Sequence, residues 1–368
     1  MRTQIDIGLT RPTCLRCAVL FGIAAFVASY STAFSEEKHL ATHKQAYTIK
    51  PTMADRDVKL ETFCVGPRGS LWMACRVQSK DGSPDKGLIM VYDPSGLLFD
   101  SFPLNFVPQA INFAPNSKMY VAGSGKVARV ALGGIVEVEI DAPNIGNREE
   151  AIAKARKKAE EEAADVREEF EVQKKQIIDR LNNITAIAAT DNEVFVACPE
   201  PVGDSYGVWR LSPDLTVEAK IIQDAHGCCG QFDIQSDGEK LILAENTKFE
   251  VGIYDRNGKR LSGFGKRAGD DQEGFGSSCN PMNVCCRADG EILTAESSIG
   301  HIKRFKSDGT FVGFVGTAKV AGECKRVAIG FDPDRNWYYM MNEDLSHVAV
   351  LVLKEEAPEE NEDELQAR

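Results

Sequence analysis

The chain has 368 residues, a formal net charge of −12 and 43% hydrophobic residues, which is an ordinary apolar share for a soluble protein. Nucleic acid needs a basic surface to neutralise its phosphates, and neither the charge balance nor a local cluster of lysine and arginine supplies one. We therefore expect no nucleic-acid partner. The length is large for one compact core, but closed β architectures reach this size as a single domain.

Residues 1–33 have the features of a secretory signal peptide. Three arginines supply positive charge: Arg2, Arg11 and Arg16. The apolar run Ala18–Tyr30 follows, and the small residues Ser31–Ala33 offer a cleavage site. The run is shorter than the roughly 20 residues that span a bilayer. We expect export to the periplasm or the extracellular space. The alternative is an uncleaved N-terminal anchor, the one arrangement in which we expect contact with a membrane.

Residues 34–57 are polar and lack a clear period, so we interpret them as a linker that can end in a strand. Over residues 58–354, short β-type runs alternate with turn sequences at hairpin spacing. Three stretches each contain four such runs: 63–102, 231–264 and 280–316. Weaker copies begin near Gln109, Ile184 and Cys324. This period predicts about six repeats of one four-stranded unit.

Residues 147–181 interrupt the repeats with a segment that has no glycine or proline and is rich in alanine, glutamate, lysine and arginine. Apolar residues recur at spacings of three and four, which predicts one face of a helix. They are Ile152, Ala155, Ala159, Ala163, Val166, Phe170, Ile177 and Leu181. A single helix over this segment would be about 50 Å long. It either lies on the repeats as a solvated helix or projects as a partner-docking or coiled-coil arm. At the other end of the chain, residues 355–368 are acidic and predicted to be disordered.

A four-stranded sheet with two apolar faces cannot bury both of them alone, and a closed ring of such sheets buries all of them. The predicted fold is therefore all-β: a six-bladed β-propeller of four-stranded blades, with one long α-helical insertion between blades 2 and 3. Ring closure is expected to borrow a strand from the segment before Phe63 for the last blade.

The unit at 280–316 carries a more specific resemblance. The stretches Asp289–Glu296, Gly300–Phe305 and Asp308–Phe311 are similar to the NHL repeat. The resemblance covers roughly residues 60–355 apart from the insertion, and it is strong in two or three units. It implies a propeller of a family whose members serve as binding platforms, as lyases and as hydrolase-like enzymes, so the fold alone does not select a function.

Eleven cysteines are present, of which Cys14 and Cys17 lie in the predicted signal peptide and nine remain after cleavage. An odd number in an oxidising compartment implies at least one free or metal-bound thiol. The repeat register places several of these cysteines at one mouth of the ring. Some precede inner strands: Cys228, Cys229, Cys279 and Cys324. Cys75 and Cys198 lie where second strands end, and His226 shares a loop with Cys228.

Thiolates with an imidazole suit zinc, copper(I) or an iron–sulfur centre, and the same thiols could instead form disulfides or stay free. The sequence leaves these alternatives open. Cys64, Cys285 and Cys286 fall within inner strands and are expected to pack as small apolar side chains. Three carboxylates are weaker candidates for a hard cation: Asp233 on an inner strand that can face the channel, and Glu245 and Glu296 at matching positions after second strands.

The favoured function is an exported binding platform for a small ligand or a protein partner, with a cysteine-lined mouth that holds a metal or a redox centre. The alternatives are a metal-dependent hydrolase or lyase similar to gluconolactonases or amidating lyases, and a scaffold that contacts a partner through 147–181. The resemblance implies carboxylate, asparagine or histidine ligands for such enzymes. Only five histidines exist, and His39 and His43 precede the repeats, so that ligand set cannot be assigned.

Overall fold

The computed structural model describes residues 39–162, 165–268, 271–276, 279–320, 324–342, 344 and 346–357. The predicted signal peptide (1–33) and residues 358–368 of the predicted acidic tail lie outside these ranges. Within them, no helix combines the length and the apolar character needed to cross a membrane.

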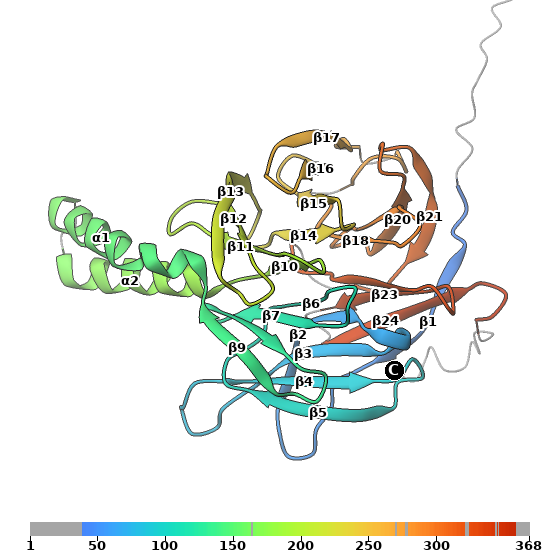
Figure 1. The fold of residues 1–368 in the computed structure, drawn as a ribbon, viewed down its shortest axis with the longest axis horizontal. Coiled ribbons are helices and arrows are strands. Elements are labelled where there is room, and N and C mark those ends of the chain that lie inside the picture. Colours follow the sequence, from blue (N-terminus) through green and yellow to red (C-terminus); the bar gives the residue numbers. More distant parts are fainter. Residues whose placement is uncertain are drawn as a thin grey trace, which may run out of the picture. The chain divides into compact units, whose positions relative to one another are not determined.

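Six antiparallel sheets of four strands form the blades (Figure 1). Blade 1 contains β2 (Val58–Val65), β3 (Leu71–Val77), β4 (Lys86–Tyr92) and β5 (Leu98–Leu104). Blade 2 contains β6 (Ala110–Phe113), β7 (Met119–Gly123), β8 (Lys126–Val130) and β9 (Val136–Asp141). Blade 3 contains β10 (Ala186–Ala189), β11 (Val194–Pro199), β12 (Ser205–Leu211) and β13 (Val217–His226).

The second half of the chain repeats the same pattern. Blade 4 contains β14 (Asp233–Ser236), β15 (Lys240–Glu245), β16 (Glu250–Asp255) and β17 (Arg260–Phe264). Blade 5 contains β18 (Asn283–Cys286), β19 (Ile292–Ala295), β20 (His301–Phe305) and β21 (Phe311–Thr317). Blade 6 contains β22 (Ile329–Asp332), β23 (Trp337–Asn342), β24 (His347–Leu353) and, from the other end of the chain, β1 (His43–Ile49).

The ring closes through β1, which pairs antiparallel with β24 from His43 opposite Leu353 to Ile49 opposite Val348. The predicted borrowing of an N-terminal strand is therefore confirmed, and part of the segment interpreted as a linker belongs to the last blade. The first strand of each blade contacts the first strands of both neighbouring blades, so β2, β6, β10, β14, β18 and β22 line the centre of the ring. The predicted six-bladed propeller is confirmed.

An apolar core fills each of the six interfaces between neighbouring blades. Alternate residues of one strand serve different interfaces, because successive side chains of a strand point to opposite faces of the sheet. On β3, Leu71 and Met73 pack in the core between blades 6 and 1, whereas Trp72 and Ala74 pack in the core between blades 1 and 2. This alternation explains why the strands near the ring centre are apolar along their whole length.

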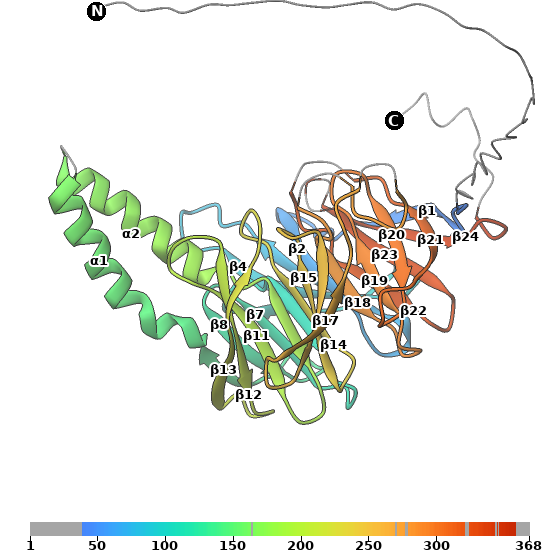
Figure 2. The ribbon, with the colours of Figure 1, turned by 90° about the horizontal axis from the view of Figure 1, so that it is seen from above.

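The insertion lies between β9 and β10, so its predicted place between blades 2 and 3 is confirmed. It consists of two helices that pack side by side, α1 (Arg148–Glu162) and α2 (Val166–Asn182), after a short 3-10 turn (Pro143–Asn147) (Figure 2). The expected single helix of about 50 Å is therefore wrong in its length. A second helix begins because the Asp165 carboxylate accepts hydrogen bonds from the backbone N–H groups of Arg167 and Glu168, as an N-cap does.

Candidate metal centre

The candidate centre lies at the mouth of the ring where the inner strands begin. The chain enters β14, β18 and β22 there, and the segment before each of these strands carries at least one cysteine. The loop before β14 is held by one hydrogen bond to the residue after β15 (Lys240–Glu245) and by one within the loop itself. The Cys228 N–H donates to Asn246 Oδ1 over 2.9 Å, and the Gln231 N–H donates to the Cys228 carbonyl over 2.9 Å. These bonds turn the loop tightly and hold Cys228 and Cys229 at the mouth.

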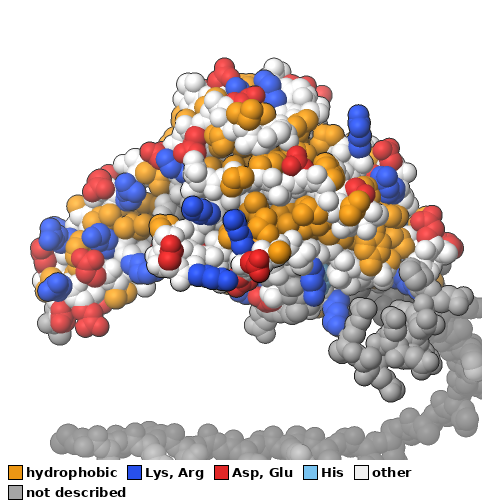
Figure 3. Space-filling view, turned by 90° about the horizontal axis from the view of Figure 1, so that it is seen from below, with side chains coloured by type: hydrophobic (Ala, Val, Ile, Leu, Met, Phe, Trp, Pro, Cys, Tyr) orange, Lys and Arg blue, Asp and Glu red, His pale blue; other side chains and the backbone are white. Residues whose placement is uncertain are grey.

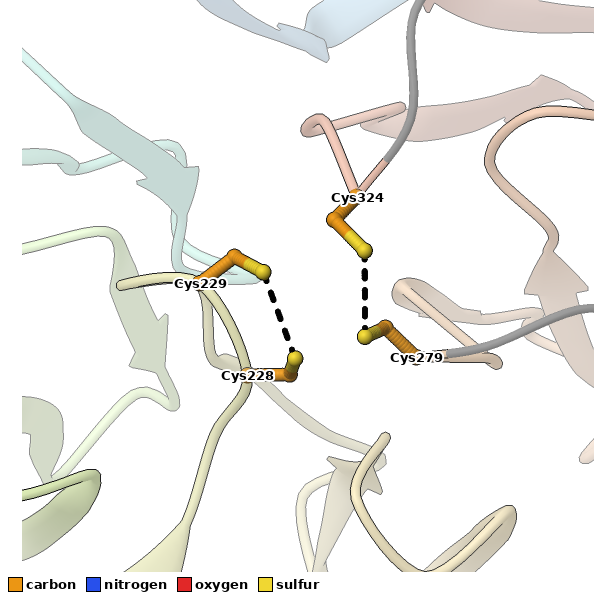
Figure 4. A group of neighbouring side chains, drawn as sticks. All are labelled: Cys228, Cys229, Cys279 and Cys324. Carbon is orange, nitrogen blue, oxygen red and sulfur yellow. Dashed lines mark hydrogen bonds between the residues drawn. The ribbon is translucent and has the colours of Figure 1, made fainter.

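Four cysteine sulfurs meet at this mouth, and we call them the four-cysteine site: Cys228, Cys229, Cys279 and Cys324. All four Sγ atoms lie within 4.8 Å of one another. The Sγ atoms of Cys228 and Cys229 are 3.3 Å apart, and those of Cys279 and Cys324 are 3.1 Å apart (Figure 4). The site therefore joins side chains that come from the entrances of blades 4, 5 and 6.

The backbone at three of these four cysteines is in the left-handed region. The φ angles are 54° at Cys229, 66° at Cys279 and 43° at Cys324. Non-glycine residues rarely adopt positive φ, and such strain concentrates where the surrounding structure holds a side chain in a required place. The three positive angles turn the thiols of separate segments toward one point. The three positive φ angles at one cluster support a built site independently of the distances between the sulfurs.

The four-cysteine site is closed on its inner side and open on its outer side. Cys279 is buried in the core between blades 5 and 6, and Cys228 and Cys324 pack against that core, whereas Cys229 is exposed. Burial and the neighbouring thiols of Cys228 and Cys324 raise the pKa of Cys229 to about 12, and the same causes raise the pKa of Cys279. Several thiolates can therefore share this space only when a cation compensates their charge.

Three residues that the sequence grouped with these cysteines lie elsewhere. Cys75 is buried on β3 in the core between blades 6 and 1, and Cys198 is buried on β11 in the core between blades 2 and 3. Each cysteine points to the same face of its sheet as the apolar residues two and four positions before it, which pack in a blade interface. Neither thiol therefore reaches the mouth. His226 ends β13 partly exposed, with its Nε2 atom 3.3 Å from Asp224 Oδ2, and is not part of the cluster.

Cys64, Cys285 and Cys286 line a cavity of 290 Å³ inside the channel, so they face space as well as the core. Asp233 shares this cavity as a carboxylate that is 6% exposed. Its Oδ2 accepts hydrogen bonds from Asn283 Nδ2 and the Val284 N–H, over 3.0 and 2.9 Å. Burial raises the pKa of Asp233 to about 6.

The other two candidate carboxylates are buried in ion pairs. Glu245 contacts the Lys248 ammonium and the Arg260 guanidinium, over 2.5 and 3.3 Å. Glu296 contacts the Lys303 ammonium over 2.6 Å. Protein cations already compensate both charges, which removes the electrostatic reason to hold a hard cation at either position.

Sequence reasoning missed Arg326, which crosses the channel mouth and is 5% exposed. Its Nη1 donates to the carbonyl oxygens of Glu61 and Gln109, over 2.8 and 2.6 Å, and its Nε donates to Gln231 Oε1 over 3.1 Å. Arg326 precedes blade 6 and so connects to the entrances of blades 1, 2 and 4. The available signal was a basic residue just before an inner strand, two positions after Cys324.

No protein-family model matches the sequence, and a comparison with curated proteins finds no match. Solved structures are similar at low sequence identity. A streptogramin B lyase is 13% identical, with 84% of this chain and 98% of that chain covered and a TM-score of 0.44. A calcium-binding regucalcin from Agrobacterium tumefaciens is 10% identical, with 85% and 96% covered and a TM-score of 0.49. A gluconolactonase from Xanthomonas campestris is 13% identical, with 86% and 100% covered and a TM-score of 0.46.

Proposed function

We propose that this chain is an exported propeller of the NHL-repeat type that acts as a binding platform, and that the four-cysteine site holds a single thiolate-bound metal ion. One observation carries the metal proposal: four sulfurs from the entrances of three blades lie within 4.8 Å of one another. Cysteine-only sites with tetrahedral geometry suit Zn²⁺. Export is supported by the charge, the apolar run and the small residues of 1–33.

The spacing of the sulfurs favours one ion over a cluster. Four thiolates at tetrahedral Zn–S bonds of about 2.3 Å are separated from one another by about 3.8 Å. The pairs Cys228–Cys229 and Cys279–Cys324, at 3.3 and 3.1 Å, need to spread by less than ~1 Å to reach that separation. An iron–sulfur cluster places several iron atoms between its thiolates and requires a wider opening. Zn²⁺ is therefore the ion that this geometry fits best.

Four protein ligands complete the coordination of zinc, which is typical of structural sites. A catalytic site keeps one position open for water or substrate. The ion would connect the loops before blades 4, 5 and 6 and fix the shape of the mouth, where a ligand or partner binds. This role supports the binding platform over the metal-dependent hydrolase or lyase.

The test is metal analysis of protein purified without added metal and without chelator, together with a visible spectrum and a thiol titration. We expect about one zinc per chain and no visible absorption. Cys229→Ser and Cys324→Ser should lose most of the zinc. The matched control is Cys198→Ala, since Cys198 is buried in a blade interface outside the site, and this variant should keep it.

Other results would contradict the metal proposal in distinguishable ways. Metal-free protein in which all the cysteines after residue 33 react with a thiol reagent rules it out. Metal-free protein that lacks two reactive thiols indicates a disulfide, for which Cys279 and Cys324, with sulfurs 3.1 Å apart, are well placed. A visible absorption band that accompanies bound iron would identify an iron–sulfur centre and refute zinc.

A further inference from the structure

A second feature of the mouth is a polar cavity of 340 Å³, which we call the mouth cavity. Its size suits a small ligand, because pockets for such molecules begin at roughly 300 Å³. The side chains that matter for its chemistry come from blade 1 and from the segments before blades 4 and 6. They are Lys59, Glu61, Arg76, Asp85, Gln231 and Arg326. Gln231 and Arg326 each lie two positions after a residue of the four-cysteine site.

The negative charges of the mouth cavity are already paired. Arg76 Nε contacts Glu61 Oε1 over 2.6 Å, and Arg76 Nη1 contacts Asp85 Oδ2 over 3.2 Å. One arginine therefore holds both carboxylates. Lys59 makes no ion pair within the described part of the chain, and Arg326 bonds only to neutral oxygens. Three cations against two carboxylates leave the cavity positive in a chain whose net charge is −12.

Three donor groups in this cavity lack acceptors among the described residues. Arg326 uses Nε and Nη1, which leaves Nη2. Because arginine can only donate, Gln231 meets it through Oε1, which leaves the Gln231 Nε2 amide free to donate. The third donor is the Lys59 ammonium. Two of the three donors are cationic, and Arg326 is more than nine-tenths buried, so an acceptor that reaches it would be shielded from water.

We propose that the mouth cavity is a binding site for a small oxyanion, a carboxylate or phosphate group, held by Lys59, Gln231 and Arg326. An oxyanion offers several acceptor oxygens to donors that have none, and it neutralises the excess positive charge. The net positive charge of the cavity would repel a cation. The oxyanion site goes beyond the proposed metal centre and requires no ion at the cysteines.

The test is isothermal titration calorimetry of the full chain at fixed ionic strength, with malonate and inorganic phosphate in separate titrations. We expect at least one of them to bind saturably at one site, and the tighter of the two identifies the group. Malonamide, the uncharged analogue of malonate, should not bind. Lys59→Gln should raise the dissociation constant about tenfold, because it removes one charged hydrogen bond.

The matched control is Lys259→Gln, an exposed lysine in the turn between β16 and β17 outside the cavity, which should bind as the wild type does. Arg326→Lys should weaken binding further. Because Arg326 also connects four blades, its substitution can disturb the fold, and the comparison of Lys59→Gln with Lys259→Gln therefore decides the test. The proposal is overturned if neither oxyanion binds, or if Lys59→Gln binds as tightly as Lys259→Gln. Metal content is measured separately, so each proposal can fail without the other.

Discussion

Asp233 is a buried carboxylate whose protonation should be visible in the stability of the whole protein. Its Oδ1 accepts from the Ile234 N–H over 2.9 Å, and its Oδ2 accepts two further hydrogen bonds. Those bonds favour the ionised form, but burial outweighs them and raises the pKa to about 6. Between the ordinary aspartate pKa and this value, the folded protein binds more protons at Asp233 than the unfolded chain does.

The free energy of unfolding should therefore fall as the pH rises through this window. A shift of about two pKa units corresponds to up to about 3 kcal/mol from this one group. We predict that Asp233→Asn removes this pH-dependent contribution. If its amide NH2 group takes the place of Oδ2, it faces two hydrogen-bond donors, which lowers the stability by a similar amount at every pH. Urea unfolding of both proteins from pH 4 to pH 7 measures the difference. A difference that stays constant over this range would contradict the assigned pKa.

The cysteines show which part of a site the residue pattern can predict. The repeat register placed Cys228, Cys229, Cys279 and Cys324 before inner strands, and these four meet at the mouth. For Cys75, the alternation of Leu71, Met73 and Cys75 on one face of β3 already indicated a blade interface. Three of the four thiols, those of Cys229, Cys279 and Cys324, turn toward their neighbours from residues with positive φ angles in separate loops. No periodic pattern encodes those angles, so the final cluster required the structure.

In the helical insertion, an N-cap residue starts a second helix where the spacing of apolar residues predicted one continuous helix. The residues Asp165 and Glu168 have the spacing of a capping box, and the structure begins α2 there. The apolar stripe continued across the break, which is why it predicted one helix. The surface of the hairpin carries mixed charges (Figure 3), and its helices contain exposed i,i+4 ion pairs such as Lys154 with Glu150. Such pairs add little stability.

The hairpin is attached to the ring at its base. Asn144 Nδ2 donates to the carbonyl oxygens of Leu181 and Pro199, over 3.1 and 3.0 Å, and Leu181 is fully buried. We predict that replacing residues 158–172 with a short glycine–serine linker leaves the unfolding temperature within about 3 °C of the wild type, since among the described residues of this segment only Ala159 is buried. Leu181→Ala should cost about 2–5 kcal/mol through the cavity it creates.

Differential scanning calorimetry measures both variants under the same conditions. A large loss on shortening the distal hairpin, equal to that of Leu181→Ala, would show that the helices support the ring along their full length. An unchanged unfolding temperature would leave the projecting part of the hairpin free for contact with a partner.

At the scale of the whole molecule, the repeats made the fold predictable, and the pairing of β1 with β24 closes the ring. Each blade presents two apolar faces, and each of the six interface cores takes its residues from two neighbouring blades. The sequence could therefore predict the ring from its period. It could not predict Arg326, because a single side chain that connects blades 1, 2, 4 and 6 acts across the ring and repeats nowhere.

Closure by β1 makes the stability of blade 6 depend on a strand near the start of the chain. Without β1, the backbone of β24 would become an open edge, and Ile49 would no longer cover the core between blades 6 and 1. We predict that deleting residues 1–49 lowers the unfolding temperature by at least about 10 °C relative to a chain that lacks residues 1–38, because several kcal/mol of burial and pairing are lost.

Deletion of residues 1–38 is the matched control, since it leaves every residue of β1 in place. Hydrogen exchange locates the effect. Amides of Val348–Leu353 should exchange much faster in the longer truncation, whereas amides of blade 3, which lies opposite blade 6 in the ring, should change least. Equal unfolding temperatures for the two truncations would mean that the ring stays closed without β1. In that case the five blades formed by continuous segments, and not the joined ends, would hold blade 6 in place.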